Sequence, residues 1–178
     1  MSVLPERLLA LHDALTEANL PHAFGGAIAL GYCTLEPRGA GDLDVNVFVT
    51  VDRAEAVFAA LPQPIAVAAL DLEHAERDGQ VRVWWEQMPI DIFFDVLPFH
   101  RELASSVRDV AFAGHTIPVV SCTALAVFKA TFDRTKHWAD IEAMVAAETI
   151  NTDAVLAWVR RMAGPDSPAA RRMAALRP

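Results

Sequence analysis

The spacing of hydrophobic residues changes along the chain from helical to strand-like. Pro5 suits a first helical turn, and the leucines that follow it recur every three or four residues, so the pattern predicts a helix over 5–18. A short strand is predicted over 20–24. It runs into Gly25-Gly26, and residues 27–32 then favour a short helix.

The clearest strand pattern lies over residues 42–49. Its apolar positions alternate, and they are Leu43, Val45, Val47 and Val49. The positions between them are Asp42, Asp44, Asn46 and Phe48. Because successive side chains of a strand point to opposite faces, one face is predicted to join the core and the other to be largely polar.

A second acidic strand is predicted over residues 90–96, with isoleucines, Phe94 and Val96 on one face and Asp91 and Asp95 on the other. Before it, Asp78-Gly79 is a hairpin signal that leads into a strand at 81–85. Trp84 and Trp85 are adjacent there and should face opposite ways. Core packing or hairpin cover is the expected role of both, and stacking on a base is the alternative for one.

From residue 101 onward the pattern is mostly helical. Ser121 or Thr123 begins a helix that reaches Phe132 and can extend to Met144, and a further helix ends at Gly164-Pro165. The expected fold is therefore α+β: a small mixed β-sheet with flanking helices in residues 1–100, and a mostly helical part, residues 101–178, packed on it.

The composition of the 178 residues narrows the class of protein. No apolar run approaches the length of a membrane span, and the first residues lack a secretion signal, so a cytoplasmic protein without a membrane partner is expected. In that setting Cys33 and Cys122, far apart in the sequence, are expected to be free buried thiols rather than a disulfide or a metal site.

Charge is distributed unevenly along the chain. The formal net charge of −8 argues against a general nucleic-acid coat. Residues 1–100 contain 5 basic and 15 acidic side chains, whereas residues 101–178 contain 10 basic and 8 acidic ones. The C-terminal arginines either dock a polyanion or form a solvated helical face, and the second interpretation is favoured; they are Arg160, Arg161, Arg171, Arg172 and Arg177.

Asp42 and Asp44 are the first candidates for chemistry. They lie on one side of one strand, about 7 Å apart from the rise per residue, so a divalent cation can bridge them. Carboxylates suit Mg²⁺, which completes its coordination with water and substrate phosphate oxygens. In two-metal phosphoryl transfer a third carboxylate helps to activate the nucleophile, and Asp91 is predicted to be that residue, with Asp95 as the alternative.

Two further groups fit a nucleotide site. Gly25-Gly26 stands at a strand-to-helix junction, where a backbone can approach phosphate closely; a tight structural turn is the alternative. Lys129 lies in an otherwise apolar stretch and either extends to solvent or meets an anion such as a triphosphate. If the helix is continuous, Lys129, Asp133, Lys136 and Asp140 form one stripe, which is also the pattern of a salt-bridge ladder.

Taken in order, these segments resemble the AbiEii/MenT-type nucleotidyltransferases of the DNA polymerase β-like superfamily. The resemblance spans about residues 20–145 and includes Gly25-Gly26, Arg38 before Asp42-Leu43-Asp44, Asp91, and the segment from Lys129 to Asp140-Ile141. It implies that Gly25 and Gly26 hold phosphate and that Asp42 and Asp44 bind the metals. It also implies nucleotide-binding roles for Arg38, Lys129, Lys136 and Asp140.

The resemblance implies an Mg²⁺-dependent transfer of a nucleoside monophosphate from an NTP to a hydroxyl, with tRNA as the expected acceptor. Several members of the family are toxins, so an antitoxin partner is expected as well. Members often have Arg-x-Thr-x-Asp, whereas Arg38 is followed here by Gly39, Ala40 and Gly41. The alternatives are transfer to a protein or to a small molecule such as an aminoglycoside, and a non-catalytic nucleotide-binding or regulatory protein on the same fold.

Overall fold

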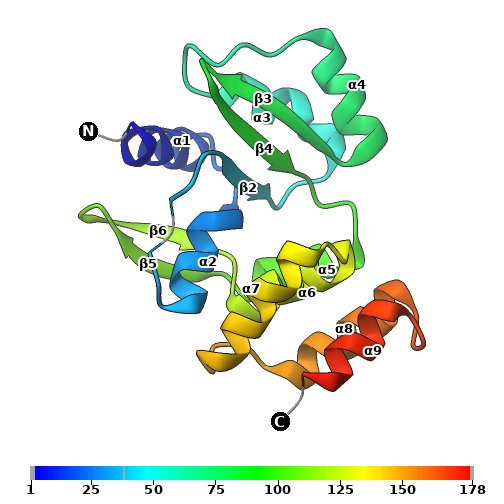
Figure 1. Cartoon of the computed structure of the whole chain (residues 1–178). Helices are drawn as coiled ribbons and strands as arrows, with labels where there is room; N and C mark the ends of the chain where they lie inside the picture. Colours follow the sequence, from blue (N-terminus) through cyan, green and yellow to red (C-terminus); the bar gives the residue numbers. More distant parts are fainter. Residues whose placement is uncertain (1–2, 38, 177–178) are drawn as a thin grey trace.

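The computed structural model describes residues 3–37 and 39–176. Within these residues six strands form one mixed sheet in the order β3-β4-β2-β1-β6-β5. The strands are β1 (His22–Phe24), β2 (Leu43–Val47), β3 (Gln80–Trp85), β4 (Met88–Phe93), β5 (Arg108–Phe112) and β6 (His115–Val119). The predicted α+β fold with a small mixed sheet is confirmed (Figure 1).

Helices connect and flank these strands. A 3₁₀ turn, Val51–Arg53, precedes α3. The α-helices are α1 (Leu4–Glu17), α2 (Gly26–Thr34), α3 (Ala54–Ala60), α4 (Ala69–Asp78), α5 (Pro98–Ser105), α6 (Cys122–Phe132), α7 (Thr135–Ala146), α8 (Thr152–Ala163) and α9 (Pro168–Ala175). In the described part of the chain none of them is long and apolar enough to span a bilayer.

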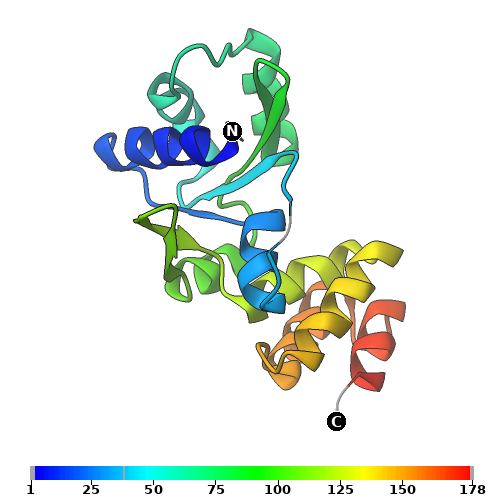
Figure 2. The ribbon, with the colours of Figure 1, turned by 60° about the vertical axis from the view of Figure 1, so that its left-hand side comes forward.

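The two faces of the sheet have different coverings. Helix α1 lies on the apolar face, where its leucines are buried and Arg7 stacks over Trp85. Phe58 of α3 also reaches this side and meets Phe94 edge-on. Helix α2 lies on the other side of the sheet (Figure 2). The alternation predicted for β2 is confirmed, because Leu43, Val45 and Val47 are buried in the core.

One local prediction was wrong just before β3. Asp78-Gly79 does not form a hairpin: residues 69–78 are helix α4, and Gly79 ends it with a φ of 68°. A glycine with positive φ is common both in two-residue hairpins and directly after a helix. Gly79 has the second role here, because it ends α4. The hairpin between β3 and β4 turns instead at Glu86 and Gln87.

The segment predicted to be mostly helical contains the β5–β6 hairpin. Strand β6 pairs in parallel with β1, so the sheet uses residues from both sides of the expected boundary at residue 100. The hairpin turns at Ala113 and Gly114, both with positive φ. Its strands are half exposed and include Pro118, which weakens the alternation from which strands are predicted.

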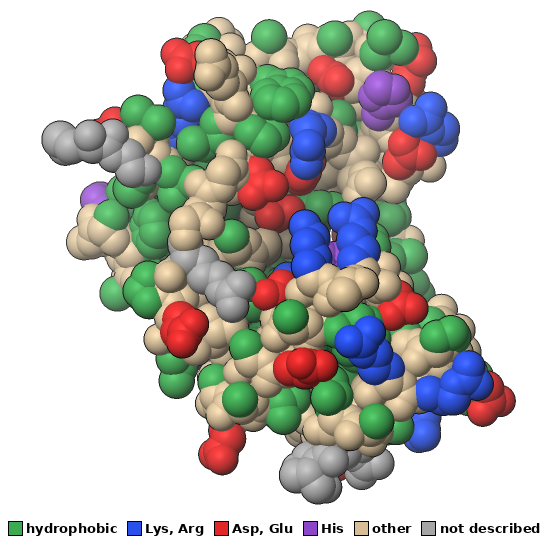
Figure 3. All heavy atoms as spheres, viewed as in Figure 1, with side chains coloured by type: hydrophobic (Ala, Val, Ile, Leu, Met, Phe, Trp, Pro, Cys, Tyr) green, Lys and Arg blue, Asp and Glu red, His purple; other side chains and the backbone are tan. Residues whose placement is uncertain are grey.

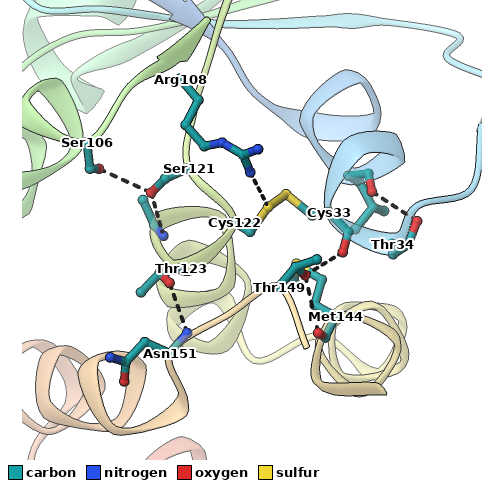
Figure 4. The surroundings of a disulfide bond; sticks show 12 residues. Cys33, Thr34, Ser106, Arg108, Ser121, Cys122, Thr123, Met144, Thr149 and Asn151 are labelled. Atoms are coloured by element: carbon teal, nitrogen blue, oxygen red, sulfur yellow. Dashed lines mark hydrogen bonds between the residues drawn. A yellow bond between two sulfur atoms is a disulfide. The ribbon is translucent and has the colours of Figure 1, made fainter. Parts of the chain in front are cut away.

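The cysteines correct the prediction of free thiols. Cys33, near the end of α2, and Cys122, at the start of α6, form a disulfide with 5.3 Å between their Cα atoms (Figure 4). The Arg108 guanidinium donates to Cys122 Sγ over 3.4 Å, and the Thr149 hydroxyl donates to the carbonyl of Cys33. The sequence separation of 89 between the cysteines hid this proximity.

Candidate active site

One line of residues crosses the polar face of the sheet. Asp44 of β2 is paired with Asp91 of β4, and Asp91 is paired with Arg82 of β3. On the other side of β2, the backbone N–H of Gly25 donates to the carbonyl of Asp44 over 2.8 Å. The two predicted carboxylates of β2 and β4 are therefore neighbours although 46 residues separate them in the sequence.

Asp91, rather than Asp95, joins this line. Asp95 follows the end of β4, and its carboxylate lies 3.9 Å from His100 Nδ1. Strand β4 ends at Phe93, and the chain then turns through Val96, which is 46% exposed instead of buried as the predicted strand required. The early end of the strand takes Asp95 off the face that Asp91 occupies.

Arg82 is a site residue that the sequence interpretation missed. Its guanidinium donates two hydrogen bonds to Asp91, from Nε to Oδ1 over 2.7 Å and from Nη2 to Oδ2 over 2.6 Å. The available signal was the alternation over 80–85, which places Arg82 opposite the buried Val81 and Val83. Counting back across the β3–β4 hairpin would have paired it with Asp91.

Gly25 and Gly26 lie against Asp44. Gly26 begins α2 with a φ of 50°, and a Cβ added there would run into the Asp44 carboxylate, 2.6 Å from Cγ. A Cβ on Gly25 would lie 3.2 Å from Asn46 Nδ2. The backbone of this junction is therefore in direct contact with the acidic strand, and only a glycine at position 26 permits that approach.

Lys129 of α6 lines the cleft together with the acidic strands. Its ammonium group donates to Asp140 Oδ2 of α7 over 2.7 Å, and both side chains are largely buried, at 13% and 14% exposure. The continuous helix considered for this segment is wrong, because Asp133 has a φ of 48° and ends α6. Asp133 accepts instead from Trp138 Nε1 over 2.6 Å, so it does not belong to the predicted stripe.

These groups surround a cleft of about 720 Å³. The sheet contributes Asp44, Asp91 and Arg82, and Asp42 lies directly before β2. Helix α4 contributes His74 and Arg77, and the α6–α7 segment contributes Lys129 and Lys136. Acidic and basic side chains gather in a hollow at the middle of this face of the molecule (Figure 3). The volume is in the range of pockets that hold small molecules and cofactors. Arg38 lies outside the described residues.

The acidic cluster disfavours its own ionisation. Burial, followed by the negative charges of Asp42 and Asp91, raises the pKa of Asp44 to about 6. Lys129 and Arg82 act in the opposite direction and do not cancel the effect. A site with this excess of negative charge favours a bound cation, because the cation would stabilise the ionised carboxylates.

The donor set fits Mg²⁺ in part. Carboxylate oxygens are the ligands that Mg²⁺ uses, and it commonly takes one or two of them and completes its shell with water and phosphate. Among the described residues, however, no three His, Cys, Asp or Glu side chains stand ready to enclose a metal ion. Both oxygens of Asp91 are held by Arg82, which leaves Asp42 and Asp44 as the pair that fits the cation.

Known structures share this architecture. No protein-family model matches the sequence, and no curated protein matches it. ANT(2")-Ia in complex with adenylyl-2"-tobramycin superposes with a TM-score of 0.65 at 14% identity, over 93% of this chain and 100% of that one. The chain has the nucleotidyltransferase fold.

Two further structures agree with that fold. The lincosamide antibiotic adenylyltransferase LnuA, with lincomycin bound, superposes with a TM-score of 0.54 at 13% identity, over 78% of this chain and 94% of that one. An antigenic nucleotidyltransferase-like protein from Paracoccidioides brasiliensis gives 0.52 at 12% identity, over 98% of this chain and 88% of that one. At such identities the likeness concerns the nucleotidyltransferase fold.

Proposed function

We propose that the chain is an Mg²⁺-dependent nucleotidyltransferase that moves a nucleoside monophosphate from an NTP to a hydroxyl. The observation that carries the proposal is the pairing of Asp44 with Asp91 on neighbouring strands, with Asp42 beside them and Lys129 lining the same cleft. A triphosphate in the cleft would meet the ammonium group of Lys129 and a cation that Asp42 and Asp44 would hold. The helix N-terminus at Gly26 adds backbone N–H groups.

The residues have separate roles in the transfer. Lys129 binds the triphosphate and neutralises its charge, and Asp140 holds the lysine in place. Asp91 accepts the proton of the acceptor hydroxyl as its oxygen attacks the α-phosphorus. The new O–P bond forms as the bond from the α-phosphorus to the bridging oxygen breaks, and pyrophosphate leaves with the electron pair.

Asp42 and Asp44 would hold Mg²⁺. The ion, when bound, supplies positive charge to the phosphate oxygens as negative charge develops on them. The raised pKa of Asp44 agrees with this role, because a carboxylate crowded by two others is stabilised by a cation.

A cationic small molecule is the acceptor that we favour. The chain is acidic overall, with a net charge of −8, and Asp42, Asp44 and Asp91 gather in the cleft. The net charge attracts a polyamine-like acceptor and repels a polyanion. The likeness to ANT(2")-Ia bound to adenylyl-2"-tobramycin, over the whole of that chain, supports an aminoglycoside-like acceptor.

Transfer to tRNA, in a toxin paired with an antitoxin, is the competing proposal. It rests on the resemblance of Gly25-Gly26, the Asp42–Asp44 pair and the Lys129-to-Asp140 segment to AbiEii/MenT-type proteins. The exposed arginines of α8 and α9 are the surface that such an acceptor would use. The net negative charge of the chain favours the cationic small molecule, and the two acceptors can be compared directly.

The test is transfer of α-labelled nucleotide. The purified chain is incubated with Mg²⁺ and each α-labelled NTP, with tobramycin, lincomycin or total tRNA as the acceptor. Label should be incorporated into the aminoglycoside by the wild type, and the Asp44→Asn variant should incorporate none. Asp95→Asn, which removes a carboxylate from outside the cleft, is the matched control and should retain transfer. Magnesium-dependent NTP binding without transfer to any acceptor would favour the non-catalytic alternative.

A further inference from the structure

The proposed reaction needs the Asp91 carboxylate, and in the structure this carboxylate is already hydrogen-bonded to Arg82. Each Asp91 oxygen accepts one hydrogen bond from the guanidinium, at 2.7 and 2.6 Å. Such a two-pronged pair is geometrically specific and satisfies the carboxylate. While Arg82 stays in this position, the affinity of Asp91 for a cation and for a proton is therefore reduced.

The positive charge of Arg82 acts beyond this one contact. Asp91 has the largest effect on the guanidinium, and Asp42 and Asp44 also stabilise its charged form. Arg82 is thus a cation of the protein itself that contacts Asp91 and interacts electrostatically with Asp42 and Asp44. A divalent cation entering the cluster encounters a site that already contains one positive charge.

Arg82 can leave this position without disturbing the core. Its side chain is 50% exposed, whereas that of Asp91 is 20% exposed. It belongs to β3, an edge strand of the sheet, and the strand is held to β4 by backbone pairing over six residues. Ion pairs with such an exposed partner contribute little to stability, so replacing Arg82 with a cation as the partner of Asp91 costs little free energy.

We propose that Arg82 is a positioning residue that holds Asp91 away from the metal site until a divalent cation and nucleotide displace its guanidinium. The inference rests on the proposed function and extends it to the resting protein. It agrees with the finding that, among the described residues, no three His, Cys, Asp or Glu side chains stand ready to hold a metal ion. It also predicts a measurable competition between Arg82 and the cation, which needs no substrate.

The experiment measures Mn²⁺ binding to the whole, nucleotide-free chain by calorimetry or by the electron paramagnetic resonance of free Mn²⁺. Arg82→Gln should bind Mn²⁺ at least about threefold more tightly than the wild type, because the competing charge is removed. Arg77→Gln is the matched control: Arg77 also lines the cleft and pairs with Asp78, and its loss should leave the affinity unchanged. Thermal unfolding confirms that both variants are folded.

A second pair of variants isolates the contact with Asp91. In an Asp91→Asn background, Arg82→Gln should tighten Mn²⁺ binding less than it does in the wild-type background, because the group that Arg82 withholds is absent and only its charge near Asp42 and Asp44 is removed. The inference is overturned if Arg82→Gln leaves the affinity unchanged or weakens it. It is also overturned if Arg77→Gln tightens binding equally, if the tightening is equally large without Asp91, or if neither wild type nor Arg82→Gln binds Mn²⁺.

The outcome for the proposed function is separate. Tighter Mn²⁺ binding by Arg82→Gln together with no transfer to any acceptor would retain the role of Arg82 and refute nucleotidyl transfer. Transfer by the wild type together with unchanged Mn²⁺ affinity in Arg82→Gln would support nucleotidyl transfer and refute the role of Arg82.

Discussion

Lys129 and Asp140 form an ion pair across the break between α6 and α7, with 2.7 Å between Nζ and Oδ2. The pair joins two helices that line the cleft, and it directs a largely buried ammonium group toward a partner of opposite charge. Its two members are expected to differ in their effects on the reaction.

Lys129→Met should raise the KM for the NTP at least about tenfold, because a charge-assisted contact to the triphosphate is lost. Asp140→Asn should lower stability by about 2 kcal/mol, since it weakens a charged hydrogen bond, and should raise KM less than Lys129→Met does. Steady-state kinetics and urea unfolding of the two variants measure both effects. Equal KM values in Lys129→Met and the wild type would remove Lys129 from the nucleotide site.

Gly26→Ala tests the close approach to Asp44. The added Cβ meets the Asp44 carboxylate, and the φ of 50° is strained for alanine, so we expect a loss of about 1 to 3 kcal/mol and at least a tenfold fall in transfer. Gly39→Ala is the control, since a Cβ there has nothing within 4 Å. The measurements are urea unfolding and initial transfer rates. An unchanged rate in Gly26→Ala would show that this junction does not position the acidic strand.

Asp44→Asn should stabilise the protein at neutral pH while abolishing transfer. The pKa of Asp44 in the folded protein, about 6, lies above its ordinary value, so ionising this carboxyl opposes folding. The gain should be about 2 to 3 kcal/mol above pH 6 and should vanish below about pH 4, where the carboxyl is protonated in both states. Urea unfolding in the presence of a chelator at pH 4 and 7.5 measures it.

The exposed carboxylate of Asp13 on α1 provides the comparison. Asp13 does not line the cleft, so the free energy of unfolding of Asp13→Asn at pH 7.5 should stay within about 0.5 kcal/mol of the wild-type value. A pH-independent gain in Asp44→Asn would contradict the crowding of the three carboxylates.

Removing the disulfide should lower the stability of the folded protein. Cys33→Ala with Cys122→Ala is expected to lower the free energy of unfolding by about 2 to 4 kcal/mol, because the cross-link restricts the unfolded chain. A reductant should lower the stability of the wild type by a similar amount and leave the double variant unchanged. Wild-type stability that is insensitive to the reductant would mean that the bond does not form in solution.

The acidic strands could be predicted from the sequence because a strand with one buried face repeats every second residue. Leu43 and Val45 are buried and alternate with Asp42 and Asp44, so the alternation alone placed both carboxylates on one face. The exposures of Trp84 and Trp85, 50% and 8%, follow the same rule. Helix α1 was predicted within a residue or two of its bounds for a similar reason, the helical spacing of its leucines.

Contacts between distant segments could not be predicted in this way. The disulfide between Cys33 and Cys122 depends on how α2 packs beside α6, and no local pattern records that arrangement. The end of α6 at Asp133 depends on a hydrogen bond from Trp138, because neither glycine nor proline marks the break. Local periodicity reports which face is buried, whereas these features depend on the tertiary partner.

Strands β2 and β4 are adjacent in the sheet, yet the chain between them runs through α3, α4 and β3 before it returns. That segment, residues 48–87, supplies His74, Arg77 and Arg82 to one wall of the cleft, while hydrogen bonds between β2 and β4 keep Asp44 opposite Asp91. The wall contacts the acidic line at Arg82, through its two hydrogen bonds to Asp91. In evolution or in the laboratory, the rest of this segment can be exchanged to change what the cleft accepts, while Arg82 and the two acidic strands are kept.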